Sequence, residues 1–192
     1  MSTCRNISPD QKLEWRLPRA VRVGEEELEV NTDYRVILTI FAALQDPQLT
    51  EQEKSWVVLK RFYKNPEKIR DPEKALAAFA NFADCGAGGR PGPRLMDWEQ
   101  DYPILAPAID RVLGYSSRSC PYLHWWEYLG AFREVGDGLF AQVVAIRRQR
   151  AKGKKLSPQQ EAFARANDNL IRLRPRLSRE EEVWMKELMD SD

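Results

Sequence analysis

Few residues of this chain belong to the types that perform covalent chemistry. Nucleophilic catalysis needs a base beside the nucleophile, and the single histidine, His124, stands before two tryptophans in a stretch with the pattern of a buried helix. A core histidine with a hydrogen-bonded ring is the commoner explanation of such a position. Aspartates and glutamates are plentiful, but they fall at predicted helix caps and surfaces, and no acidic pair has the spacing of metal ligands. The sequence therefore predicts a protein that is not an enzyme and that needs no cofactor.

The cysteines are odd in number and widely spaced, at Cys4, Cys85 and Cys120. They form no Cys-x-x-Cys pair, and with one histidine they make no plausible zinc site. Reduced thiols in a cytosolic protein are the simplest account. No stretch approaches the roughly 20 apolar residues that span a bilayer, and the polar N-terminus does not resemble a signal peptide. We expect a cytoplasmic protein without a membrane segment.

The glycine-rich stretch at 86–94, Gly-Ala-Gly-Gly-Arg-Pro-Gly-Pro-Arg, is similar in composition to a phosphate-binding loop. Such a loop needs successive free backbone N–H groups, a preceding strand and usually a following Lys-Ser or Lys-Thr. Here two prolines remove donors, no such dipeptide follows, and a predicted helix precedes. We expect a mobile connector at this position instead.

A basic run occupies 147–155, where no acidic residue interrupts it. Its members are Arg147, Arg148, Arg150, Lys152, Lys154 and Lys155. Clustered Lys and Arg can neutralise the phosphates of a nucleic acid. However, no aromatic residue is interleaved, and the net charge of the whole chain is only +1. The favoured interpretation is a solvated helix end and linker, with cations at the favourable C-terminal pole of a helix, and a nucleic-acid contact is the alternative.

The elements that would position these residues are mostly helices. The chain has 192 residues, of which 43% are hydrophobic and 31% charged, as in a soluble globular domain with a short appendage. Alternating apolar residues on either side of Gly24 predict a β-hairpin at about 19–31. Helical spacing and capping patterns predict six to eight helices, which begin near Asp33, Thr50, Asp71, Tyr102, Pro121, Leu139, Ser157 and Ser178. The predicted fold is mainly α.

This pattern divides the chain into three predicted parts. Residues 1–16 are expected to be a loosely ordered N-terminus, and residues 17–150 an α-helical domain that includes the hairpin. Residues 151–192 are expected to form a helical C-terminal extension, with a single helix from 157 to about 173 and a last helix from 178.

An aromatic stretch at 121–132 is predicted to be the central helix of the domain. Pro121 suits a first helical turn, because its missing N–H is no loss there and its φ is already helical. Five rings follow, at Tyr122, Trp125, Trp126, Tyr128 and Phe132. A helix that is apolar on two faces is normally buried by several neighbours. The alternative is that one ring remains at the surface as an anchor for a partner.

The last predicted helix is amphipathic. Ser178 and Glu181 have the spacing of a capping box, and Val183 and large apolar residues follow. Such a helix either docks on its own domain or offers an apolar stripe to another chain. We hypothesise that the aromatic helix and this helix together bind a partner, through Trp125, Trp126, Tyr128, Phe132, Trp184, Met185 and Leu188.

Four short motifs resemble those of the bacteriophage gene-product-fifteen family, small proteins of long-tailed phages and prophages. They are Asn-Thr-Asp-Tyr-Arg at 31–35, Leu-Gln-Asp-Pro-Gln-Leu-Thr at 44–50, Trp-Glu-Gln-Asp at 98–101 and Leu-His-Trp-Trp-Glu at 123–127. The last is the most specific of the four. The resemblance covers about residues 17–150, and family members usually have a shorter connector where 86–94 stands here.

This resemblance implies a tail assembly chaperone that acts in the host cytoplasm. The implied partners are the long, helical tape measure protein, which the chaperone keeps soluble, and the major tail tube protein, which it recruits during tail morphogenesis. Such genes are often the second of two overlapping reading frames, so self-association and a companion chaperone frame are further expectations. A membrane partner is not expected.

Two other functions remain open at this point. One is a structural tail-completion or connector component that is retained in the virion, where it would form a ring. The other is a nucleic-acid-binding regulator that uses the basic run, which salt-dependent retention on DNA would detect.

Overall fold

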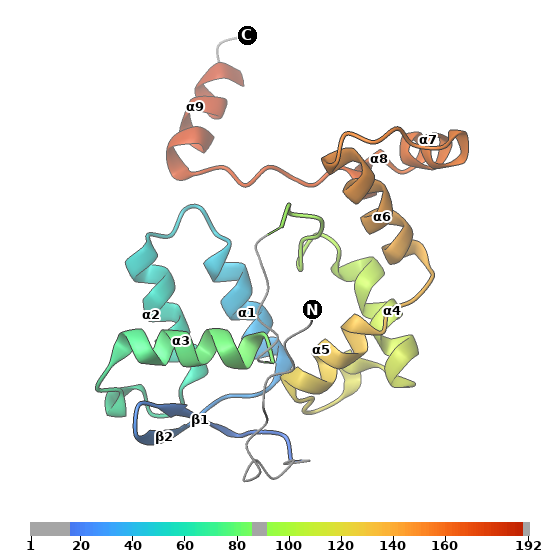
Figure 1. Cartoon of the computed structure of the whole chain (residues 1–192). Coiled ribbons are helices and arrows are strands. Elements are labelled where there is room, and N and C mark those ends of the chain that lie inside the picture. Colours follow the sequence, from blue (N-terminus) through green and yellow to red (C-terminus); the bar gives the residue numbers. More distant parts are fainter. Residues whose placement is uncertain (1–15, 86–91, 190–192) are drawn as a thin grey trace, which may run out of the picture.

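The computed structural model describes residues 16–85 and 92–189. This part of the chain contains nine α-helices, two short 3-10 helices and one two-stranded antiparallel sheet, so the predicted mainly α fold with a small hairpin is confirmed. Figure 1 shows the hairpin and helices α1–α3 on one side and helices α4–α8 on the other, with α9 above the first side. The expected loose N-terminus and most of the 86–94 connector lie outside the described residues.

The hairpin consists of β1 (Ala20–Val23) and β2 (Glu26–Glu29), with Val23 opposite Glu26. Gly24 at the first turn position has a φ of +64°, which matches the glycine requirement of a type II′ two-residue turn. Val23 and Leu28 are buried, and β1 packs against α3. A two-stranded hairpin is marginal in water, so this packing holds it in place.

Three capped helices follow the hairpin: α1 (Tyr34–Leu44), α2 (Glu51–Phe62) and α3 (Pro72–Ala83), with a 3-10 turn at Pro66–Lys68. The side chains of Asp33 and Asp71 accept backbone N–H groups of the first turns of α1 and α3. Thr50 and Glu53 form the predicted capping box of α2. Local sequence therefore sets the starts of all three helices.

The second side of the fold contains α4 (Tyr102–Leu113), a 3-10 turn at Ser117–Ser119, α5 (Trp125–Arg133) and α6 (Leu139–Ala151). Helix α5 packs against both α1 and α4, and α6 packs against α4. Gly114 ends α4 with a φ of +77°, the left-handed conformation usual at a helix C-terminus.

Helix α5 begins at Trp125 and not at Pro121, so the predicted start is wrong by one turn. The segment before it is extended, because its backbone pairs with the residues that precede α1. Tyr34 N–H donates to the Leu123 carbonyl at 3.0 Å, and Trp125 N–H donates to the Thr32 carbonyl at 2.7 Å. His124 then caps the helix, since its Nδ1 accepts the Trp126 N–H at 3.0 Å.

The C-terminal extension contains α7 (Pro158–Ala166), α8 (Asp168–Ile171) and α9 (Arg179–Met189). A single helix was expected from 157 to about 173, but Asn167 divides it. The Asn167 side chain donates to the Phe163 carbonyl at 3.0 Å, in the manner of a residue that competes with the helical ladder.

Two hydrophobic clusters hold these elements together. The larger one joins the hairpin and helices α1–α6, and Trp125 is its largest fully buried side chain. The smaller one joins α6, α7 and α8 through Val143, Ile146, Ala164 and Ile171. Among the described helices, none is both long and apolar enough to cross a membrane.

Candidate partner-binding site

Two of the proposed partner-binding residues on α5 are part of the core. Trp125 is 1% exposed, and its Nε1 donates to the Ala83 carbonyl at 2.8 Å. Tyr128 is fully buried and stacks on Tyr34 with ring centroids 4.3 Å apart. A partner cannot reach either ring while the domain is folded, because neighbouring helices cover them. Their burial removes both from the candidate surface.

The other two aromatic residues of α5 are half-buried. Trp126 donates from Nε1 to the Phe82 carbonyl at 2.8 Å, which leaves its indole N–H satisfied within the chain. Phe132 packs on Trp98 and Phe140, at centroid distances of 5.1 and 6.2 Å. Of the predicted α5 residues, Phe132 also borders an open groove.

His124 is buried, and both of its ring nitrogens have partners. Nδ1 accepts the Trp126 N–H, so the proton lies on Nε2, which donates to the Pro18 carbonyl at 2.9 Å. The ring therefore joins the helix start to the segment before the hairpin. This position agrees with the interpretation of His124 as a core histidine.

The groove beside Phe132 has a volume of about 640 Å³. Its apolar wall comes from Met96, Phe132, Phe140 and Val144, on the loop before α4 and on helices α5 and α6. Arg94, Arg148 and Arg176 also line it. The groove therefore combines an apolar wall with positive charge at its margin.

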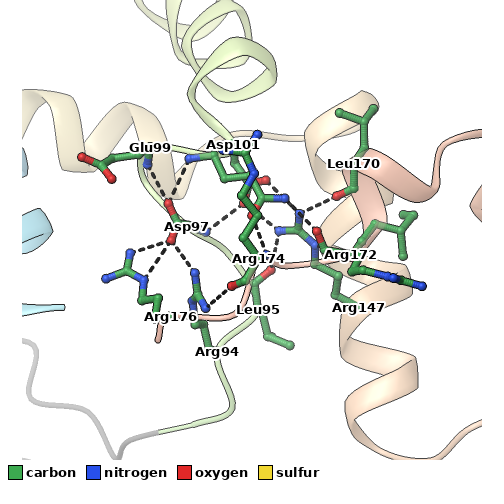
Figure 2. A network of polar contacts seen from close by, with 12 residues as sticks. Arg94, Leu95, Asp97, Glu99, Asp101, Arg147, Leu170, Arg172, Arg174 and Arg176 are labelled. Carbon is green, nitrogen blue, oxygen red and sulfur yellow. Dashed lines mark hydrogen bonds and ion pairs between the residues drawn. The ribbon is translucent and has the colours of Figure 1, made fainter. Parts of the chain in front are cut away.

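A buried ion pair links α4 to α6 (Figure 2). The Arg147 guanidinium donates to both carboxylate oxygens of Asp101, at 2.6 and 2.9 Å, and both side chains are at most 4% exposed. Its remaining N–H groups donate to the carbonyls of Leu95, Leu170 and Ile171. All five guanidinium donors are thus used, which is what makes the burial of a charge tolerable.

A second carboxylate, Asp97, lies next to this pair and binds two arginines (Figure 2). It accepts from Arg94 and from Arg176, the latter at 2.5 Å, and also from the backbone N–H groups of Glu99 and Gln100. Burial by itself raises the pKa of Asp97, but the bonds from Arg176, Gln100, Arg94 and Glu99 outweigh it, so the pKa lies well below its ordinary value of 3.8.

These contacts fix the segment 172–176, which we call the tether, along the loop before α4. The Gln100 side chain donates to the Arg172 carbonyl at 2.7 Å and accepts the Arg174 N–H at 2.9 Å. Arg94 donates to the Arg174 carbonyl at 3.0 Å. The tether is therefore bound to the domain by polar contacts on both sides, and α9 begins three residues after Arg176.

Helix α9 presents large apolar side chains to solvent. Trp184 is 61% exposed, and Val183, Met185 and Leu188 are between 41% and 52% exposed. Figure 1 shows α9 at the far end of the tether, well apart from α5 and α6. Helix α9 makes no extensive packing contact with another described element. Of the partner-binding residues proposed from the sequence, those on this helix are the most exposed.

The basic run divides between two environments. Arg147 is buried in the ion pair with Asp101, whereas the rest of the run is exposed at the end of α6 and beyond, at Arg148, Arg150, Lys152, Lys154 and Lys155. The exposed members agree with a solvated helix end. A run of like charges in the sequence does not indicate that Arg147 forms a buried ion pair.

Sequence reasoning placed Asp101 in the motif at 98–101 and Arg147 in the basic run but did not pair them, and it missed Asp97 and Arg176. A signal was present, since the two aspartates flank the Trp-Glu-Gln motif one helical turn apart, and Arg172, Arg174 and Arg176 alternate in an extended pattern. Nothing in the sequence stated that these two segments meet.

Comparison with known proteins finds a family-model match for the N-terminal part. Residues 13–85 match the model of a family described as Bacteriophage Gp15 protein. This match supports the resemblance to that family over residues 13–85. It includes the motifs at 31–35 and 44–50, and it does not reach those at 98–101 and 123–127.

The other two comparisons found no relative. Neither a curated protein nor a solved structure matches this chain. The N-terminal match takes in the hairpin and helices α1–α3, so the tether and α9 lie outside the region of family similarity.

Proposed function

We propose that this protein is a phage tail assembly chaperone, which binds the tape measure protein in the host cytoplasm and recruits tail tube subunits to it. The observation that carries the proposal is the exposed apolar face of α9, formed by Trp184, Met185 and Leu188. The similarity of residues 13–85 to a bacteriophage protein family supports a role in a phage.

The physical argument concerns helix recognition. An amphipathic helix binds a helical partner through residues spaced three or four apart, and Trp184 and Leu188 have this spacing. Tryptophan in such a position is a frequent source of binding energy. A tape measure protein, as a long helical chain, would offer many sites of this kind, so several copies would coat it.

The proposed role needs neither catalysis nor a cofactor. The position of His124 supports this view, because both ring nitrogens are engaged and the ring lies in the core. We therefore propose that the protein is not an enzyme.

The test is co-expression with the tape measure protein of the same genome, followed by size-exclusion chromatography with light scattering. The wild-type chain is expected to make the tape measure soluble and to elute with it in several copies. The double variant Trp184→Ser with Leu188→Ser is expected to lose this activity without a change in melting temperature, since both side chains are exposed.

The matched control is Trp56→Ser, which removes a tryptophan of equal exposure from α2. It is expected to keep full activity. If Trp56→Ser and the double variant lose activity equally, α9 is not the binding element. If the tape measure stays insoluble and the chain elutes alone as a closed ring, a structural component of the virion is the better description.

A further inference from the structure

The exposed helix α9 and the groove between α5 and α6 are complementary in chemistry. Each has an apolar part, formed on the helix by Trp184 and Leu188 and in the groove by Phe132 and Val144. The groove is large enough for side chains of this size, at about 640 Å³, within the usual range of roughly 300–1,000 Å³ for binding pockets.

Their charges are also opposite. Arg94, Arg148 and Arg176 line the groove, and Asp97 offsets only one of these charges, which leaves a surplus of two positive charges. The sequence of α9, Arg-Glu-Glu-Glu-Val-Trp-Met-Lys-Glu-Leu-Met, contains two more acidic than basic residues. An acidic amphipathic helix is therefore the ligand that this groove would recognise, and α9 is such a helix.

The tether carries α9 away from the groove of its own chain. Bonds to Gln100 and Asp97 hold the segment up to Arg176, and α9 starts three residues later, apart from α5 and α6 (Figure 1). The pKa of Glu53 is lowered chiefly by hydrogen bonds with Thr50, and Arg179 contributes a smaller attraction. Figure 1 shows α9 on the same side of the molecule as α2.

We propose that α9 of one copy of this chain docks in the groove of a second copy, whose own α9 docks in return. Such an exchange is a two-fold arrangement in which each copy supplies one helix and one groove. Both apolar surfaces are then covered, and the acidic helix lies among the arginines. A helix of 11 residues buries a modest area, so the dimer is weak, with a Kd of order micromolar.

This inference goes beyond the proposed function, since it concerns the protein without its partner. The exchange would cover the apolar face of α9 until a tape measure helix displaces it. Self-association is measured on the isolated chain and chaperone activity by co-expression, so each proposal can fail while the other stands.

The experiment is light scattering of the isolated full-length chain over a range of concentrations. The wild type is expected to shift from monomer to dimer, and Arg148→Glu to weaken the dimer by at least about tenfold. Arg150→Glu is the matched control, because it makes the same charge change on the exposed end of α6, outside the groove lining. It is expected to leave the dimer nearly unchanged.

A mixture of two variants separates exchange from docking within one chain. Arg148→Glu and Glu180→Arg each place like charges together in their own dimers, so each variant alone is expected to dimerise at least about tenfold more weakly than the wild type. When they are mixed, one interface of the mixed dimer keeps the wild-type groove and helix, and the other joins the substituted groove to the substituted helix. Neither interface then carries the added repulsion, so the dimer is expected to return. A wild-type chain that stays monomeric at all concentrations, a mixture that does not associate, or equal losses for Arg148→Glu and Arg150→Glu would overturn the proposal.

Discussion

Two short helices of this chain, α5 and α9, both contain tryptophan among other large apolar residues, and they have opposite surroundings. In α5, Trp125 is 1% exposed and its N–H is bound to a carbonyl of α3. In α9, Trp184 is 61% exposed at the end of a segment held by polar contacts. The difference shows that residue type marks a helix as apolar, whereas the neighbours supplied by the fold decide whether its side chains are buried or exposed.

The largest expected effect is on the α5 side of this comparison. Trp125→Ala removes the largest fully buried side chain and leaves a cavity, so the free energy of unfolding is expected to fall by about 4 kcal/mol. Urea denaturation of the purified variant measures this loss. A change below about 1 kcal/mol would show that the core closes around the missing ring.

The second largest effect is expected at the ion pair of Asp101 and Arg147, which also binds α8 to the domain. Arg147→Met leaves the Asp101 carboxylate buried without its partner and is expected to cost about 3 kcal/mol. Hydrogen exchange is expected to increase in α7, α8 and the tether, because Arg147 binds carbonyls of Leu170 and Ile171. The neighbouring exposed residue offers the control, Arg148→Met, for which a change under about 0.5 kcal/mol is expected.

The stability that Asp97 gives to the tether is expected to fall at acidic pH. The folded-state pKa of Asp97 is depressed, so its contribution is fully present above the ordinary value of 3.8 and is lost as pH falls below that value. Asp97→Asn is expected to cost about 2 kcal/mol at neutral pH and to reduce the loss of stability between neutral pH and pH 3. Denaturation midpoints at several pH values measure both effects. Parallel pH curves for the two proteins would contradict this assignment.

A smaller effect, of opposite sign, is expected inside the α5 core. The Tyr128 hydroxyl is buried and has no hydrogen-bond partner among the described residues, and its burial raises the pKa of the phenol. Tyr128→Phe removes an unsatisfied polar group and keeps the stacked ring, so stability is expected to stay equal or to rise by up to about 1 kcal/mol. Thermal unfolding measures the difference, and a clear loss of stability would mean that the hydroxyl is bonded.

The smallest effect on stability is expected at α9. Trp184→Ala should change the free energy of unfolding by less than about 0.5 kcal/mol, because the ring contributes little to the fold. Calorimetry of this variant beside Trp125→Ala tests the comparison directly. Similar losses in both variants would show that α9 is packed as core.

Much of the fold follows from local sequence. Asp33, Thr50 and Asp71 start their helices by capping, and Gly24 permits the turn of the hairpin, because each acts on backbone groups within three residues. Apolar spacing then identifies the helices themselves. The sequence by itself thus determined a mainly α protein with a hairpin, and two amphipathic or apolar helices that could bind a partner.

Only the tertiary structure decided how the remaining residues are used. The backbone pairing of 32–34 with 123–125 moved the start of α5 to Trp125, and the ion pair of Asp101 with Arg147 turned one member of a basic run into a buried cross-link. Both are contacts between segments at least 46 residues apart. Local patterns carry no information on such contacts, since they depend on how the helices pack. For the same reason, the exposure of Trp184 and the burial of Trp125 became distinguishable only in the folded chain.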